Sequence, residues 1–103
     1  MNIKNTALDG RNKAAFLAGY WAGTDINELE LVKDINWIIN NHGECIGAEI
    51  MVDPMLYVSL NANGGKLTYI DNNKEHHVMR FQNLPLYRET CEAGDNAMRD
   101  LFA

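Results

Sequence analysis

The sequence predicts an α+β protein with its elements in the order α-α-β-β-β-β-α. Apolar side chains recur every three or four residues before residue 43, as on one face of a helix, and every second residue after it, as in a half-buried strand. Helical spacing returns near the C-terminus. The chain has 103 residues, of which 47% are hydrophobic, as expected for one globular unit. We therefore expect residues 1–103 to form a single α+β domain.

The N-terminal part is expected to form an αα-hairpin. Residues 11–22 are rich in alanine, leucine and aromatic residues and contain no proline, which favours a helix. Gly23 follows as a stop signal. Asp25, with Glu28 three residues later, marks the start of a second helix that is expected to run to about Asn41. The short link between the two helices makes them antiparallel neighbours.

The next part is expected to form a four-stranded antiparallel meander. The predicted strands cover residues 45–52, 56–60, 66–70 and 75–82. Two turns separate the last three strands: residues 61–65 are rich in asparagine and glycine, and residues 71–74 are rich in aspartate and asparagine. Such short links join antiparallel neighbours. A last helix begins at residues 83–85, where proline is tolerated in the first turn. Gly94 lies inside this helix, where glycine costs about 1 kcal/mol relative to alanine.

Negative charge is concentrated in residues 25–53. This block holds seven carboxylates and one lysine, a formal charge of −6, whereas the whole chain carries −5. The carboxylates are Asp25, Glu28, Glu30, Asp34, Glu44, Glu49 and Asp53. A localised field of this kind attracts basic partners and repels nucleic-acid phosphates. The nine lysines and arginines do not cluster, so direct nucleic-acid binding is not expected.

Three of the seven carboxylates have a local structural explanation. Asp25 and Glu28 suit a helix N-terminus, and Asp53 belongs to a break before Pro54. The other four have none, and Met51 and Tyr57 lie near them in sequence as apolar anchors. The predicted partner-binding residues are Glu30, Asp34, Glu44, Glu49, Met51 and Tyr57. An ordinary solvated face that keeps the protein soluble is the competing interpretation of the same charges.

A metal or Cys/His site is the second interpretation of the chemistry-bearing residues. His42 and Cys45 have the spacing of a zinc knuckle, and further histidine and cysteine residues could complete four ligands. The full set is His42, Cys45, His76, His77 and Cys91. The second half of the set is irregularly spaced and no thiol is placed at a helix N-terminus, so no metal, cofactor or catalytic residue is predicted. A small metal-binding or Cys/His enzymatic domain remains an alternative.

These observations predict a non-enzymatic protein-binding module. Its most concrete form is an inhibitor or regulator of a nucleic-acid-handling protein, acting by steric or nucleic-acid-mimicking contact. Phage counter-defence (anti-CRISPR-like) proteins and immunity proteins share this size and charge, which is an analogy only. A homo-oligomeric accessory protein, including a homodimer, is the other alternative. The chain shows neither a membrane-spanning apolar run nor a signal-peptide core, so a cytoplasmic location is expected.

Overall fold

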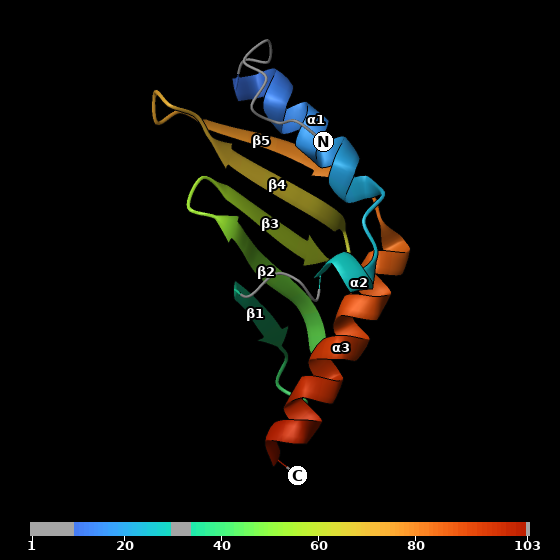
Figure 1. Ribbon diagram of the computed structural model, residues 1–103. Coiled ribbons are helices and arrows are strands. Elements are labelled where there is room, and N and C mark those ends of the chain that lie inside the picture. The colour runs from blue at the N-terminus through green and yellow to red at the C-terminus, as the bar shows by residue number, and fades with distance from the viewer. Residues whose placement is uncertain (1–9, 30–33, 103) are drawn as a thin grey trace.

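Five strands form one antiparallel sheet in which neighbours in sequence are neighbours in space (Figure 1). The structure is a computed structural model that describes residues 10–29 and 34–102. In chain order the elements are α1 (Gly10–Ala22), α2 (Ile26–Leu29), β1 (Asp34–Ile39), β2 (Cys45–Asp53), β3 (Leu56–Asn61), β4 (Gly64–Ile70), β5 (His76–Phe81) and α3 (Leu84–Phe102). The α+β class and the antiparallel meander are confirmed.

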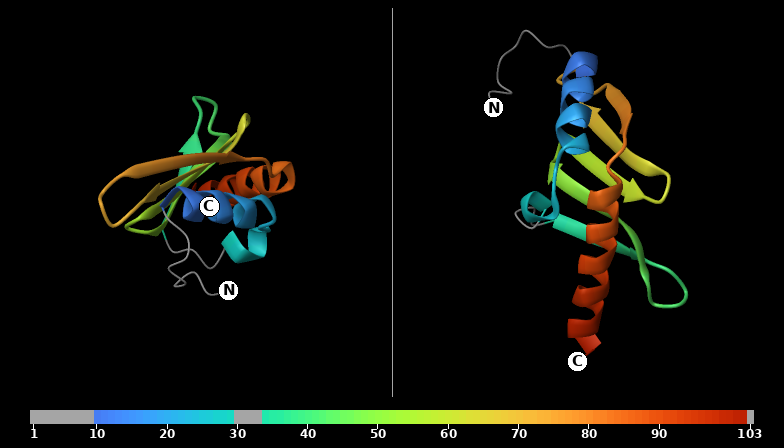
Figure 2. Two further views of the ribbon diagram at one scale, coloured as in Figure 1. Left: turned by 90° about the horizontal axis from the view of Figure 1, so that it is seen from above. Right: turned by 90° about the vertical axis from the view of Figure 1, so that its right-hand side faces the viewer.

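The two long helices cover one face of the sheet. α1 packs on β4 and β5, and α3 crosses β2, so that both lie on the same side (Figures 1 and 2). The paired residues Ile50, Val58 and Leu67 form a buried row across β2, β3 and β4 beneath them. We call the opposite side the outer face. Within residues 10–29 and 34–102, no helix lies over it.

The predicted second helix is wrong from residue 34 onward, and with it the αα-hairpin and the count of four strands. α2 is a single turn, and residues 34–39 form β1, which pairs with β2. Ile35, Trp37 and Ile39 fit a spacing of two as well as the helical spacing, and β-branched and aromatic residues favour strands. Pairing with β2 decides between the two. Residues 30–33, including the predicted site residue Glu30, lie outside the described residues.

Asn83 joins the two long helices. Its side-chain oxygen accepts a hydrogen bond from the backbone N–H of Leu86 (3.0 Å), which caps the start of α3. Its side-chain nitrogen donates to the carbonyl oxygens of Trp21 (3.2 Å) and Thr24 (2.7 Å) at the end of α1. One side chain therefore satisfies backbone groups at the ends of two helices.

α3 lies against β1 and β2 through its middle turn. Leu86, Thr90 and Gly94, spaced four residues apart, are buried along its inner side. A Cβ atom at Gly94 would overlap the sulfur of Cys45 and lie 3.0 Å from a ring carbon of Trp37. The glycine thus permits the close approach of helix and sheet. Among the described residues, no helix is both long enough and apolar enough to cross a membrane.

Candidate functional site

The outer face is built from two rows of side chains that cross all five strands. Residues paired directly across neighbouring strands point to the same side of a sheet. The first row is Asp34, Met51, Tyr57, Thr68 and Val78, and the second row is Asn36, Glu49, Ser59, Lys66 and Arg80. None of these ten residues is buried. The rows alternate with the buried side chains that face the helices.

Four of the six predicted partner-binding residues meet on this face. Asp34, Glu49, Met51 and Tyr57 line an open hollow of about 400 Å³ over β1, β2 and β3. The side chain of Met51 is 37% exposed and that of Tyr57 is 42% exposed. Two carboxylates therefore border two half-exposed apolar side chains, an arrangement suited to contact with another macromolecule.

Charge on the outer face is divided between its two sides. Asp34 and Glu49 lie on β1 and β2, whereas Lys66 and Arg80 occupy β4 and β5 in the second row. Within residues 10–29 and 34–102, none of these four side chains makes an ion pair. Glu49 and Lys66 are two strands apart, which separates their backbones by about 10 Å. The acidic side was predicted from the sequence, whereas the basic side was not.

Glu44 does not join the hollow. It lies in the turn between β1 and β2, where its backbone N–H donates to the side-chain oxygen of Asn40 (3.0 Å). Together with Asp95 and Arg99 of α3 it borders a second hollow of about 420 Å³. The inclusion of Glu44 in one surface with Asp34 and Glu49 is therefore not supported by the geometry.

The structural roles expected for two acidic residues are confirmed. The side chain of Asp25 accepts hydrogen bonds from the backbone N–H groups of Asn27 (3.0 Å) and Glu28 (3.2 Å) at the start of α2. Asp53 accepts a hydrogen bond from the backbone N–H of Met55 (2.7 Å) in the tight turn between β2 and β3. These carboxylates are occupied by the backbone and do not contribute to the hollow.

The five histidine and cysteine residues do not come together. Cys45 and Cys91 are neighbours between β2 and α3, and His42 lies in the turn before β2. His76 and His77 lie on β5, three strands from β2, which corresponds to about 14 Å across the sheet. Burial raises the pKa of the Cys45 thiol, so the reactive thiolate form is disfavoured. The set therefore cannot act as one metal or catalytic site.

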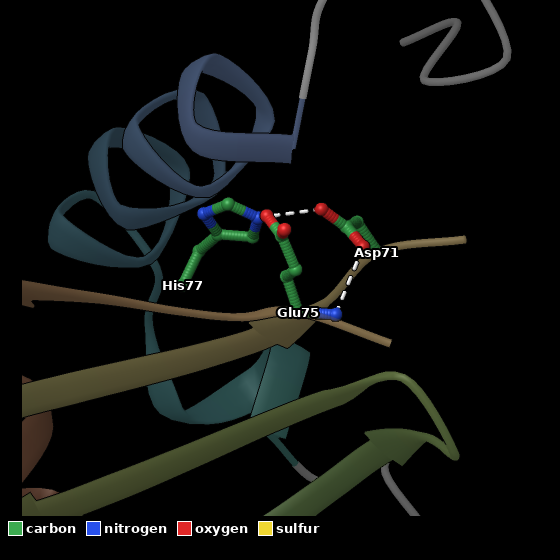
Figure 3. Close-up of side chains that lie close together, drawn as sticks. All are labelled: Asp71, Glu75 and His77. Carbon is green, nitrogen blue, oxygen red and sulfur yellow. Dashed lines mark hydrogen bonds and ion pairs between the residues drawn. The ribbon is translucent and has the colours of Figure 1, made fainter. Parts of the chain in front are cut away.

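His77 instead meets two carboxylates at the turn before β5 (Figure 3). Its Nε2 atom lies 2.7 Å from Oδ2 of Asp71, and Glu75 places a carboxylate oxygen within 4.8 Å of both. The three donor atoms have the chemistry of a divalent-cation site. However, Oδ1 of Asp71 already accepts backbone N–H groups from Asn73 (2.8 Å) and Glu75 (3.0 Å).

The start of α1 supplies a second reason to assign this cluster a structural role. A Cβ atom at Gly10 would lie 2.6 Å from Nε2 of His77 and 2.9 Å from Oδ2 of Asp71, so the helix N-terminus sits against the cluster. The positive end of a helix dipole stabilises a carboxylate without a cation. The hydrogen bond with His77 lowers the pKa of the Asp71 carboxyl. The cluster holds the turn and α1 together.

This cluster was not predicted from the sequence, because only the three-dimensional structure shows that its members are in contact. Tyr69 stacks on His77 with ring centroids 6.4 Å apart, and the ammonium of Lys13 lies 5.0 Å from the centroid of the Tyr69 ring. The only sequence signal was the turn composition of residues 71–74.

Compared with known protein families, curated proteins and solved structures, the chain has no match.

Proposed function

We propose that this chain is a small protein-binding module that docks a basic protein surface on the acidic side of its outer face. The observation that carries the proposal is the convergence of Asp34, Glu49, Met51 and Tyr57 on one open hollow. Carboxylates beside half-exposed apolar and aromatic side chains combine electrostatic attraction with apolar contact area, as protein interfaces do. The module acts in the cytoplasm and without catalysis.

The partner class that we put forward is a nucleic-acid-handling protein, because such proteins present basic grooves to their ligands. Two routes to inhibition follow from the acidic side: imitation of nucleic acid or steric obstruction of the groove. Imitation needs carboxylates that recur along the length of a groove. The two rows of the outer face hold only two carboxylates, Asp34 and Glu49. The cations Lys66 and Arg80 lie on the other side of the same face. Steric obstruction is therefore the version that we favour.

The test is affinity capture from cell lysate with matched charge variants. The face variant is Asp34→Lys/Glu49→Lys, and the control is Glu92→Lys/Asp100→Lys on the exposed side of α3. Both variants change the formal charge by the same amount. We expect the wild type and the control to capture the same basic protein, and added DNA or RNA to displace it. The face variant should lose it.

Two results would contradict the proposal. Retention of every captured protein by the face variant would show that the acidic side is not the contact. Loss of capture by the control as well would show that net charge, rather than this surface, governs binding. Circular dichroism of each variant establishes that the fold is retained, which is expected because none of the four substituted side chains is buried.

A further inference from the structure

We infer that the outer face is self-complementary and binds a second copy of this chain. The inference goes beyond the proposed function, since it concerns the protein alone. It rests on the order of charges along the second row of side chains, which reads Asn36, Glu49, Ser59, Lys66 and Arg80 from β1 to β5. Acidic and basic groups thus stand on opposite sides of the central strand, β3.

A two-fold axis parallel to β3, running between two outer faces, satisfies this pattern. Such a rotation places each row opposite the same row of the second copy and reverses the order of the strands. β2 then faces β4 of the second copy, and β1 faces its β5. Glu49 meets Lys66 of the second copy, and the symmetry makes the same contact twice. Asp34 faces Val78 of the second copy, with Arg80 two residues further along that strand.

Apolar side chains occupy the middle of the contact. Tyr57 lies on β3, so the axis brings the Tyr57 side chains of the two copies together. Met51, which is 37% exposed, is its neighbour on β2, and Val78, which is 52% exposed, ends the same row on the edge strand β5. Two antiparallel sheets that pack face to face in this way lie about 10 Å apart with nearly aligned strands. That spacing accommodates a glutamate and a lysine extended toward each other.

The small size of the face favours a weak dimer. Five strands about 4.8 Å apart and six residues about 3.3 Å apart give roughly 24 by 20 Å, or about 480 Å² of projected area. Stable interfaces cover about 800 Å² on each partner. We therefore expect a dimer that dissociates on dilution and in high salt. Its formation covers the acidic side, so the second copy and a basic partner protein compete for the same surface.

Sedimentation of the purified protein, with no other protein present, tests the dimer. We expect wild type to show a concentration-dependent monomer–dimer equilibrium that added salt shifts toward monomer. Glu49→Lys and Lys66→Glu should each raise the dissociation constant by about tenfold or more, because two attractive contacts become repulsive. Glu92→Lys and Arg88→Glu on α3 are the matched controls and should leave it unchanged.

Mixing the two single variants is the decisive step. The Glu49→Lys copy carries a lysine at both positions of the contact, and the Lys66→Glu copy carries a glutamate at both. A mixed dimer therefore has two attractive contacts, and the mixture should restore association that neither variant shows alone.

Three results overturn the inference. The first is a wild type that stays monomeric up to millimolar concentration; this result would not contradict the binding of a different protein to the acidic side. The second is a dimer whose dissociation constant is not changed by Glu49→Lys. The third such result is a pair of single variants whose mixture does not associate.

Discussion

Replacing Gly94 with alanine tests how closely α3 packs on the sheet. The added Cβ atom would overlap the sulfur of Cys45 and lie 2.9 Å from the Cys45 Cβ atom. Carbon atoms in favourable contact are about 3.5–4.0 Å apart, so helix and sheet must separate. Cys45 is 6% exposed and packed on its other sides, and it has little room to move.

Two opposing effects set the magnitude. Alanine is favoured over glycine inside a helix by about 1 kcal/mol. Overpacking a close-packed interior costs about 1–3 kcal/mol, and the overlap with a buried thiol belongs at the upper end of that range. We therefore expect Gly94→Ala to lower the free energy of unfolding by about 1–2 kcal/mol. Gly19→Ala on α1 is the control, because a Cβ atom there meets nothing within 4 Å. It should stabilise the protein.

Urea unfolding followed by circular dichroism measures both variants and a rescue. Cys45→Ala removes the sulfur that the new methyl group would overlap. Gly94→Ala should therefore cost less in the Cys45→Ala background than in wild type, giving a favourable coupling energy in the double-mutant cycle. If Gly94→Ala stabilises the protein as Gly19→Ala does, α3 does not press on β2 at Cys45 and the packing described above is refuted.

Three further predictions test other parts of the structure. Asn83→Ala should lower the free energy of unfolding by about 2–3 kcal/mol, since three hydrogen bonds are lost. Asn83→Ser keeps a capping hydroxyl but removes the amide that donates to the two carbonyl oxygens. In urea unfolding it should lower the free energy of unfolding by less than Asn83→Ala, and equal losses would contradict the cap. Leu67→Ala should lower the free energy of unfolding by about 2–5 kcal/mol, because Leu67 is buried beneath the helices. Val78→Ala should change it by no more than about 0.5 kcal/mol, because Val78 is on the outer face. In a carboxyl NMR titration Asp71 should have a pKa below its usual range, and His77→Ala should raise it. Because the pKa of Asp71 is lower in the folded state, its interaction with His77 stabilises the protein above the unfolded-state pKa, and this stabilisation is lost as the pH falls through the folded-state pKa. An unchanged Asp71 titration in the His77→Ala variant would refute the pairing.

The parts of the fold that were predictable from the sequence are those with one unambiguous spacing. In β3, Leu56, Val58 and Leu60 alternate with Tyr57 and Ser59, and the structure buries the first set and leaves the second at the outer face. No helical stripe fits those residues equally well. The turns on either side carry asparagine, glycine or aspartate, which marks the strand ends.

β1 could not be predicted for the opposite reason. Its apolar residues satisfy both spacings, and the acidic start signal at Asp25 favoured continuing the helix through them. Only the partner strand decides the outcome, because Ile35, Trp37 and Ile39 become half-buried in the sheet when β1 pairs with β2. A contact of this kind with another segment is not encoded in local propensity.

The composition of the candidate site depended on that same missed strand. In the predicted helix, Asp34 would have shared a face with Glu30 and would have had no fixed relation to Glu49. As a residue of β1 it pairs with Met51, and Glu49 becomes its diagonal neighbour. Asp34 and Glu49 were singled out from the sequence, but their grouping on one face follows from the pairing register.

The outer face also changes what the net charge means. The chain carries −5, yet the two rows hold two carboxylates and two cations, which sum to zero. At physiological ionic strength charges act over about 8 Å. This is less than the distance of about 10 Å between the acidic and basic sides of the outer face. A partner approaching one side therefore meets that side's charge and little of the remainder. The contact itself selects for a partner with the opposite order of charges, which a second copy turned by a two-fold axis presents.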